Sequence, residues 1–161
     1  MFVSEYKDNY FNDVARLLAD FRVTLNSFKG NKSEPDLDAA KEELKFHLNN
    51  KFPLYVTIKD NKVVGYILLR VDGVVWVEHI YVDKSHRREG IASLLFAKAE
   101  EYSNNLHEDT LFNYVHPNND AMISFLKSKG YSVLNLIEIR KPYKDEQPTK
   151  RIKVGNHEFD Y

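Results

Sequence analysis

The sequence contains no cysteine among its 161 residues. This absence excludes a disulfide framework, a thiolate nucleophile and thiolate ligands for zinc or an iron–sulfur cluster. A basic excess is also missing, because 23 lysines and arginines face 24 aspartates and glutamates, and this disfavours a general nucleic-acid-binding protein. No apolar run approaches the roughly 18 residues of a membrane span, and the first residues lack the pattern of a signal peptide. We therefore expect one cytoplasmic domain over residues 1–161, with neither nucleic-acid nor membrane partners.

The sequence does contain alternating helical and strand patterns. Helical spacing of apolar residues covers residues 9–25, 36–52, 90–106 and 120–129. Strand-like segments cover residues 2–5, 54–59, 63–70, 74–82, 111–115 and 132–140. Residues 151–161 alternate apolar and polar side chains around Gly155-Asn156, so a last strand or hairpin is expected there, within a possible C-terminal extension over residues 142–161. The order βααβββαβαββ predicts an α+β domain around a mixed sheet.

The most informative stretch is residues 77–95, VEHIYVDKSHRREGIASLL. A strand leads into a basic loop, and Gly90 then opens a helix. The first turn of a helix has unpaired N–H groups and a partial positive charge, so it favours anions. Gly90 and Ala92 let a phosphate approach the backbone closely, and Arg87 and Arg88 add cationic donors. The stretch indicates a pyrophosphate site that is neither a Walker loop nor a dinucleotide-binding glycine loop.

These residues resemble the GCN5-related N-acetyltransferases (GNAT). The family signature Arg/Gln-x-x-Gly-x-Gly/Ala is matched by residues 87–92, RREGIA. A second signature, an asparagine followed by an apolar helix that ends in Gly-Phe, is matched from Asn119 to Gly130-Tyr131. Either motif alone is weak, but the two in this order are strong, and the resemblance covers residues 2–141.

The resemblance implies a mixed sheet of six to seven strands with helices on both faces and a V-shaped splay between the fourth and fifth strands. It implies acetyl-CoA as co-substrate and transfer of the acetyl group to a primary amine of a small molecule or a protein N-terminus. The pantetheine arm would pair with the backbone of the fourth strand, as an added strand does. The cofactor-binding residues implied are Ile80, Tyr81, Val82, Arg87, Arg88, Glu89, Gly90, Ile91, Ala92, Ser93, Asn119, Phe125 and Leu126.

The resemblance also suggests which residues move protons. Glu78 lies two residues before Ile80, where relatives often carry a general base. The tyrosine that often protonates the leaving thiolate is replaced here by Leu126. Tyr114 is the candidate substitute, with His116 as its neighbour of the same strand parity. A solvent-facing Glu78 and a merely packed Tyr114 are the alternatives.

Other features indicate no further chemistry. No histidine stands in a metal-ligating pattern with a carboxylate partner, so no metal is expected. The acidic residues Glu34, Asp36, Asp38, Glu42 and Glu43 are expected to form a solvated helix face. Two other functions stay open: a catalytically silent acyl-CoA-binding sensor or structural module, and a protein that uses the arginine loop for another nucleotide. A homodimer through the C-terminal segment is a further option.

Overall fold

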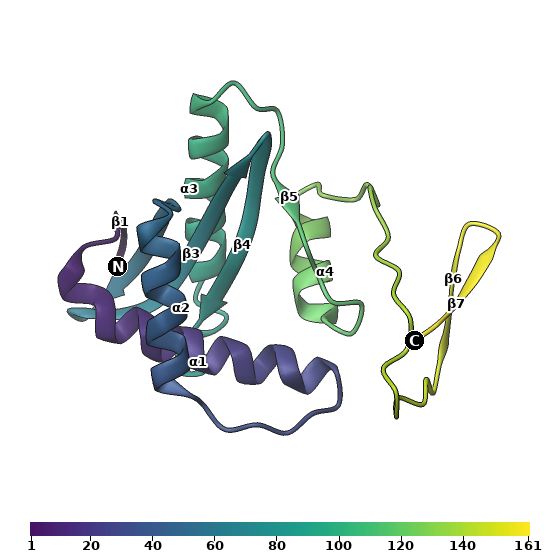
Figure 1. Cartoon of the computed structure of the whole chain (residues 1–161). Helices are drawn as coiled ribbons and strands as arrows, with labels where there is room; N and C mark the ends of the chain where they lie inside the picture. Colours follow the sequence, from purple (N-terminus) through teal and green to yellow (C-terminus); the bar gives the residue numbers. More distant parts are fainter. The chain divides into compact units, whose positions relative to one another are not determined.

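The structure, a computed structural model, describes all residues from 1 to 161, which divide into two compact units, Met1–Ser124 and Phe125–Tyr161. The first unit holds β1 (Phe2–Glu5), α1 (Phe11–Phe28), α2 (Leu37–Asn49), β2 (Leu54–Lys59), β3 (Lys62–Asp72), β4 (Val74–Val82), α3 (Ile91–Asn105) and β5 (Phe112–Asn113) (Figure 1). The boundary lies within α4 (Asp120–Ser128), and the second unit continues to β6 (Arg151–Val154) and β7 (His157–Asp160). The helices include none with the length and apolar character of a membrane span.

The main sheet has five strands in the order β1-β2-β3-β4-β5. Its first four strands pair antiparallel, whereas β4 and β5 pair in parallel. The predicted α+β class with a mixed sheet is therefore confirmed. The β4–β5 pairing covers only Trp76 with Phe112 and Val77 with Asn113. Since β4 continues to Val82, its last five residues have no strand partner on the β5 side, and this is the expected splay.

Helices cover both faces of the sheet, as the alternation of side chains along β3 requires. Tyr66 and Leu68 point into the core formed with α1 and α2. Gly65 points to the other face, where a Cβ would lie 3.0 Å from Ile91 Cγ2 and 3.3 Å from Leu95 Cδ1 of α3. The missing side chain thus lets the first turns of α3 pack closely against the sheet.

Several predicted helix ends have the expected chemistry. The Asp36 side chain accepts a hydrogen bond from Ala39 N–H and caps α2. Gly130 has a φ of 88°, and the Tyr131 N–H donates to the Leu126 carbonyl. This is the left-handed ending that glycine allows, and it ends α4 as predicted.

The strand prediction for residues 132–140 is wrong. Within the second unit only β6 and β7 pair, and they pair with each other. A segment with strand propensity becomes a strand only where a neighbour supplies hydrogen-bond partners. The main sheet therefore counts five strands rather than the six to seven expected, and β5 is shorter than residues 111–115. The last two strands of the chain are instead β6 and β7, which form a hairpin around Gly155-Asn156.

Candidate active site

The predicted phosphate loop and the first turn of α3 form one continuous backbone feature of the first unit. Gly90 adopts a φ of 81° as the N-cap of α3, and a Cβ there would meet open space. The Leu94 N–H is the first to bond within the helix, to the Gly90 carbonyl. The N–H groups of Ile91, Ala92 and Ser93 are therefore left for a ligand, and no acidic side chain lies in this turn. The geometry suits an anion.

Asp83 holds the start of this loop. Its carboxylate accepts from the Ser85 N–H at 3.0 Å and from the Ser85 hydroxyl at 2.7 Å. Arg16 of α1 donates to the same side chain at 3.0 Å. Burial raises the pKa of Asp83, but these hydrogen bonds and the Arg16 charge outweigh it, so the pKa is lowered. An ion pair thus ties the loop to α1.

The two loop arginines differ in position. The Arg87 guanidinium lies 5.5 Å from the centre of the Tyr81 ring, and its Nε donates to the Val82 carbonyl at 3.4 Å. Arg88 is exposed and has a φ of 66°, a left-handed conformation that few non-glycine residues adopt. The neighbouring Glu89 is neutralised by Lys59 of β2, whose Nζ lies 2.7 Å from Oε2. The Glu89 carboxylate therefore does not cancel the positive charge of Arg87 and Arg88.

Glu78 lies at an irregularity of β4. Leu68 faces His79 and Leu69 faces Val77, so Glu78 has no partner residue on β3, as in a β-bulge. Arg70 Nε donates to Glu78 Oε2 at 3.0 Å, and the Arg70 guanidinium lies 5.5 Å from the centre of the Trp76 ring. The carboxylate is therefore held by a neighbour and is not a free surface charge.

Tyr114 stacks on Trp76 with ring centres 4.5 Å apart and an angle of 8° between the planes. Its side chain is exposed, so its hydroxyl is accessible. His116 stacks instead with Phe28 of α1 and accepts a hydrogen bond on Nδ1 from the Asn118 N–H at 3.1 Å. Burial and the Lys29 charge lower the pKa of His116. A neutral imidazole that accepts on Nδ1 is a poorer proton donor than Tyr114.

The second signature is built around α4. Asn119 Oδ1 accepts from the Met122 N–H at 3.1 Å, so Asn119 acts as a helix cap. Phe125 and Leu126 follow on the same helix and belong to the second unit, where Leu126 is buried. The structure thus gives Asn119 a structural role that is independent of any cofactor.

A buried polar cluster was missed by sequence reasoning. Glu43 and His47 of α2 meet His79 of β4, and Arg22 of α1 donates from Nε to Glu43 Oε2 at 2.9 Å. Burial raises the pKa of Glu43, but hydrogen bonds from His47 and Arg22 outweigh it and lower the pKa to about 2. Burial and the Arg22 charge lower the pKa of His79 to about 3. The expectation that Glu43 lies on a solvated face is wrong, and the Glu43-x-x-x-His47 spacing was the signal that could have revealed the cluster.

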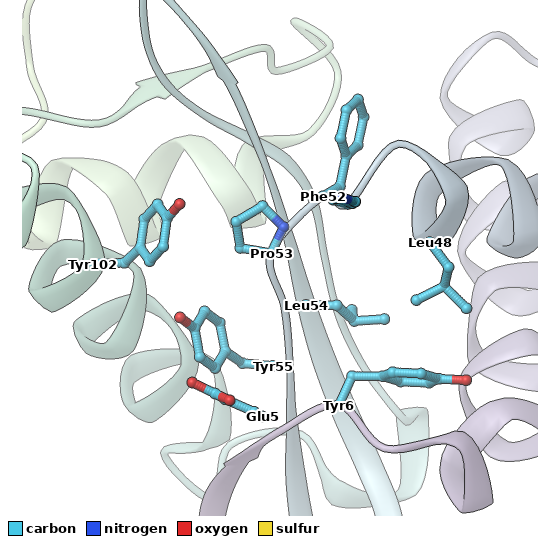
Figure 2. A pocket seen from close by; sticks show the side chains of 9 residues that line it. Glu5, Tyr6, Leu48, Phe52, Pro53, Leu54, Tyr55 and Tyr102 are labelled. Atoms are coloured by element: carbon cyan, nitrogen blue, oxygen red, sulfur yellow. The ribbon is translucent and has the colours of Figure 1, made fainter.

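One open pocket of about 360 Å³ lies elsewhere on the first unit (Figure 2). It is lined by Glu5, Tyr6, Leu48, Lys51, Phe52, Pro53, Leu54, Tyr55 and Tyr102. None of the predicted site residues is among them. Tyr102 lies in the last turns of α3, whereas the phosphate loop precedes its first turn. The pocket is therefore separate from the candidate site.

Comparisons with known proteins identify the family and the fold of the chain. The sequence profile described as the acetyltransferase (GNAT) family matches residues 15–131. A mutant of the BH1408 protein from Bacillus halodurans has a similar structure, with a TM-score of 0.74, 19% identity, and coverage of 89% of this chain and 99% of that one. The aminoglycoside antibiotic 6'-N-acetyltransferase AAC(6')-IG from Acinetobacter haemolyticus has a TM-score of 0.66, 18% identity, and coverage of 90% and 100%.

AAC(6')-Iy, solved in complex with a bisubstrate analogue that contains CoA, has a TM-score of 0.64, 19% identity, and coverage of 88% and 97%. None of the curated proteins compared with the chain matches it. The fold is that of an acetyltransferase. Since the family profile covers most of the sequence, the chain belongs to the GNAT acetyltransferase family.

Proposed function

We propose that this protein transfers the acetyl group of acetyl-CoA to a primary amine, and that the acceptor is a small molecule or a protein N-terminus. The observation that carries the proposal is the combination of two features in the first unit. The backbone of β4 lacks a β5 partner after Val77, and the free N–H groups of α3 begin directly after the adjoining loop. A cytoplasmic location is part of the proposal.

The cofactor assignment follows from these two features. The free edge of β4 at Ile80, Tyr81 and Val82 suits a pantetheine arm, whose amides can pair with a strand edge. The N–H groups of residues 91–93, with Arg87 and Arg88 beside them, suit a pyrophosphate. Asn119, which lies in the first unit, belongs to the proposed site through the second family signature, whereas cofactor binding by Phe125 and Leu126 stays a prediction from that signature.

For the reaction we assign Glu78 as the base and Tyr114 as the acid. The amine is protonated at neutral pH and must lose a proton before it attacks the thioester carbonyl. Glu78 is held in place by Arg70 and lies next to the free edge of β4. Tyr114 offers an accessible hydroxyl to the leaving thiolate. It stacks on Trp76, the Arg70 guanidinium lies over the same Trp76 ring, and Arg70 donates to Glu78. A backbone N–H of β4, such as that of Ile80, would stabilise the charge that develops on the carbonyl oxygen.

The same fold could serve a catalytically silent acyl-CoA sensor, and Leu126 at the position of the usual tyrosine favours that second candidate. The structural relatives include aminoglycoside acetyltransferases, so small polyamines and aminosugars stand beside N-terminal peptides among the acceptors to test.

A screen of acceptors tests the proposal. Acetyl-CoA is mixed with the protein and with polyamines, aminoglycosides, amino acids or N-terminal peptides, and the released CoA thiol is measured with a thiol reagent. Because the chain has no cysteine, the protein contributes no background. Release with at least one amine supports the proposal. CoA binding without release from any amine would favour the sensor, and failure to bind CoA would refute both candidates.

A further inference from the structure

Three metal-ligand atoms converge beneath α2 in the first unit. The side chains of Glu43, His47 and His79 each offer one such atom, and these atoms all lie within 4.8 Å of one another. Glu43 and His47 are four residues apart on α2 and therefore share one face of the helix, while His79 reaches them from β4. The two imidazoles are nearly closed to solvent, with 7% and 4% of their side chains exposed.

The distances match a metal site. Bonds of about 2.1 Å from zinc to nitrogen or oxygen in tetrahedral geometry place neighbouring ligand atoms about 3.4 Å apart. Glu43 Oε1 lies 3.4 Å from His47 Nε2 and 3.5 Å from His79 Nε2. Two edges of the tetrahedron are therefore already present. The third needs the two rings to approach each other, and His47 Nδ1 has no hydrogen bond that resists such a rotation.

One of the ligands also has a supporting neighbour. Tyr66 Oη lies 3.5 Å from His79 Nδ1. A hydrogen bond from Nδ1–H to this hydroxyl leaves Nε2 as the free lone pair, which is how outer partners orient histidine ligands.

In this structure, Arg22 supplies the positive charge beside Glu43. Its guanidinium pairs with both oxygens of Glu43, and Nη2 lies 3.3 Å from His79 Nε2. Its side chain is 45% exposed, so it can turn toward solvent. We propose that Glu43, His47 and His79 form a binding site for a divalent transition metal of the zinc type, which takes the place of the Arg22 guanidinium. Three protein ligands leave a fourth position open toward the side from which Arg22 withdraws.

This proposal departs from the expectation that no metal binds. That expectation considered only histidines that lie close together in the sequence. His79 is far from Glu43 and His47 along the chain and meets them only because α2 packs against β4. His79 lies between Glu78 and Ile80 of the proposed acetyl-CoA site, but none of the three metal ligands is assigned to that site, and metal binding is tested without measuring acetyl transfer.

The experiment uses the full chain stripped of metal with a chelator. Zinc is titrated in competition with a chromogenic chelator, and cobalt(II) is added separately because its visible absorption is strong only in tetrahedral sites. Four variants are compared with the wild type: His47→Gln and Glu43→Gln remove ligands, Arg22→Met removes the competing cation, and His107→Gln is the matched control at an exposed histidine outside the cluster.

We expect the wild type to bind one zinc per chain and to give a tetrahedral cobalt spectrum. Zinc affinity should fall at least about tenfold in either ligand variant, rise in Arg22→Met and stay unchanged in His107→Gln. Circular dichroism shows which variants fold. If the ligand variants do not fold, Arg22→Met and the cobalt spectrum of the wild type still decide. The proposal is overturned if the wild type and Arg22→Met both fail to bind zinc stoichiometrically, if the cobalt spectrum is octahedral, or if folded ligand variants bind as tightly as the wild type.

Discussion

Replacing Gly90 with aspartate tests where the cofactor phosphates bind. A Cβ at this position meets no atom within 4 Å, so the new side chain enters open space and does not clash with the fold. The φ of 81° costs a side-chain-bearing residue about 1–2 kcal/mol of stability. The aspartate also places a negative charge next to the free N–H groups of residues 91–93, where the pyrophosphate is proposed to bind.

Coulomb's law gives the expected loss of CoA binding free energy in Gly90→Asp. At about 5 Å and an effective dielectric constant of about 20, each unit of phosphate charge is repelled by about 3 kcal/mol. Such a loss raises the dissociation constant for CoA by at least about a hundredfold. A CoA concentration of 100 times the wild-type dissociation constant stabilises the wild type by about 2.7 kcal/mol. The same concentration should stabilise Gly90→Asp by only about 0.4 kcal/mol.

The assay is chemical denaturation with and without CoA, and Gly90→Asn is the matched control. Asparagine has the size of aspartate, carries no charge and tolerates left-handed backbone better than most residues. It should retain most of the stabilisation by CoA. If Gly90→Asp is stabilised as strongly as the wild type, the placement of the phosphates is wrong. If both variants lose the effect equally, charge is not the cause.

Four further variants test the rest of the structure. Glu78→Gln and Tyr114→Phe should each lower kcat by about 10²–10⁴-fold with CoA affinity nearly unchanged. The loss in Glu78→Gln should become smaller as pH rises, because the free amine becomes abundant. If both variants lose less than about threefold in kcat while chemistry is rate-limiting, neither residue has the proposed role. Asp83→Ala should lower the free energy of unfolding at pH 7 by about 1 kcal/mol. Because the folded state lowers the pKa of Asp83, this carboxylate stabilises the fold above its ordinary pKa, and the stabilisation is lost as pH falls below it. The difference in unfolding free energy between wild type and Asp83→Ala should therefore be smaller at pH 3 than at pH 7. An equal difference at both pH values would contradict the ion-pair explanation. Deleting residues 150–161 should lower the melting temperature or change the oligomeric state seen by light scattering, and no change in either would show that the hairpin is dispensable.

Local patterns predicted most of the fold. The strands at residues 54–59 and 74–82 appear with the same ends as β2 and β4, because β-branched runs between turn residues leave few alternatives. Helix α2 begins after Asp36, and α4 ends before Gly130, because both residues supply end groups that the helix itself cannot. Residues 132–140 show the limit of such reasoning: their composition fits a strand, but strand formation depends on a partner that a local pattern does not specify.

The candidate site divides in the same way. The proposed phosphate loop and the first turn of α3 are contiguous in sequence, so residue order alone was enough to predict the uncapped helix start at Gly90. The bulge at Glu78 and the stacking of Tyr114 on Trp76 depend on register between strands, which only the folded sheet sets. The cluster of Arg22, Glu43 and His79 combines three elements that are far apart along the chain. Its hydrogen bonds and shifted pKa values exist because α1 and α2 pack on β4 and bury His79, and only the tertiary structure decided that packing.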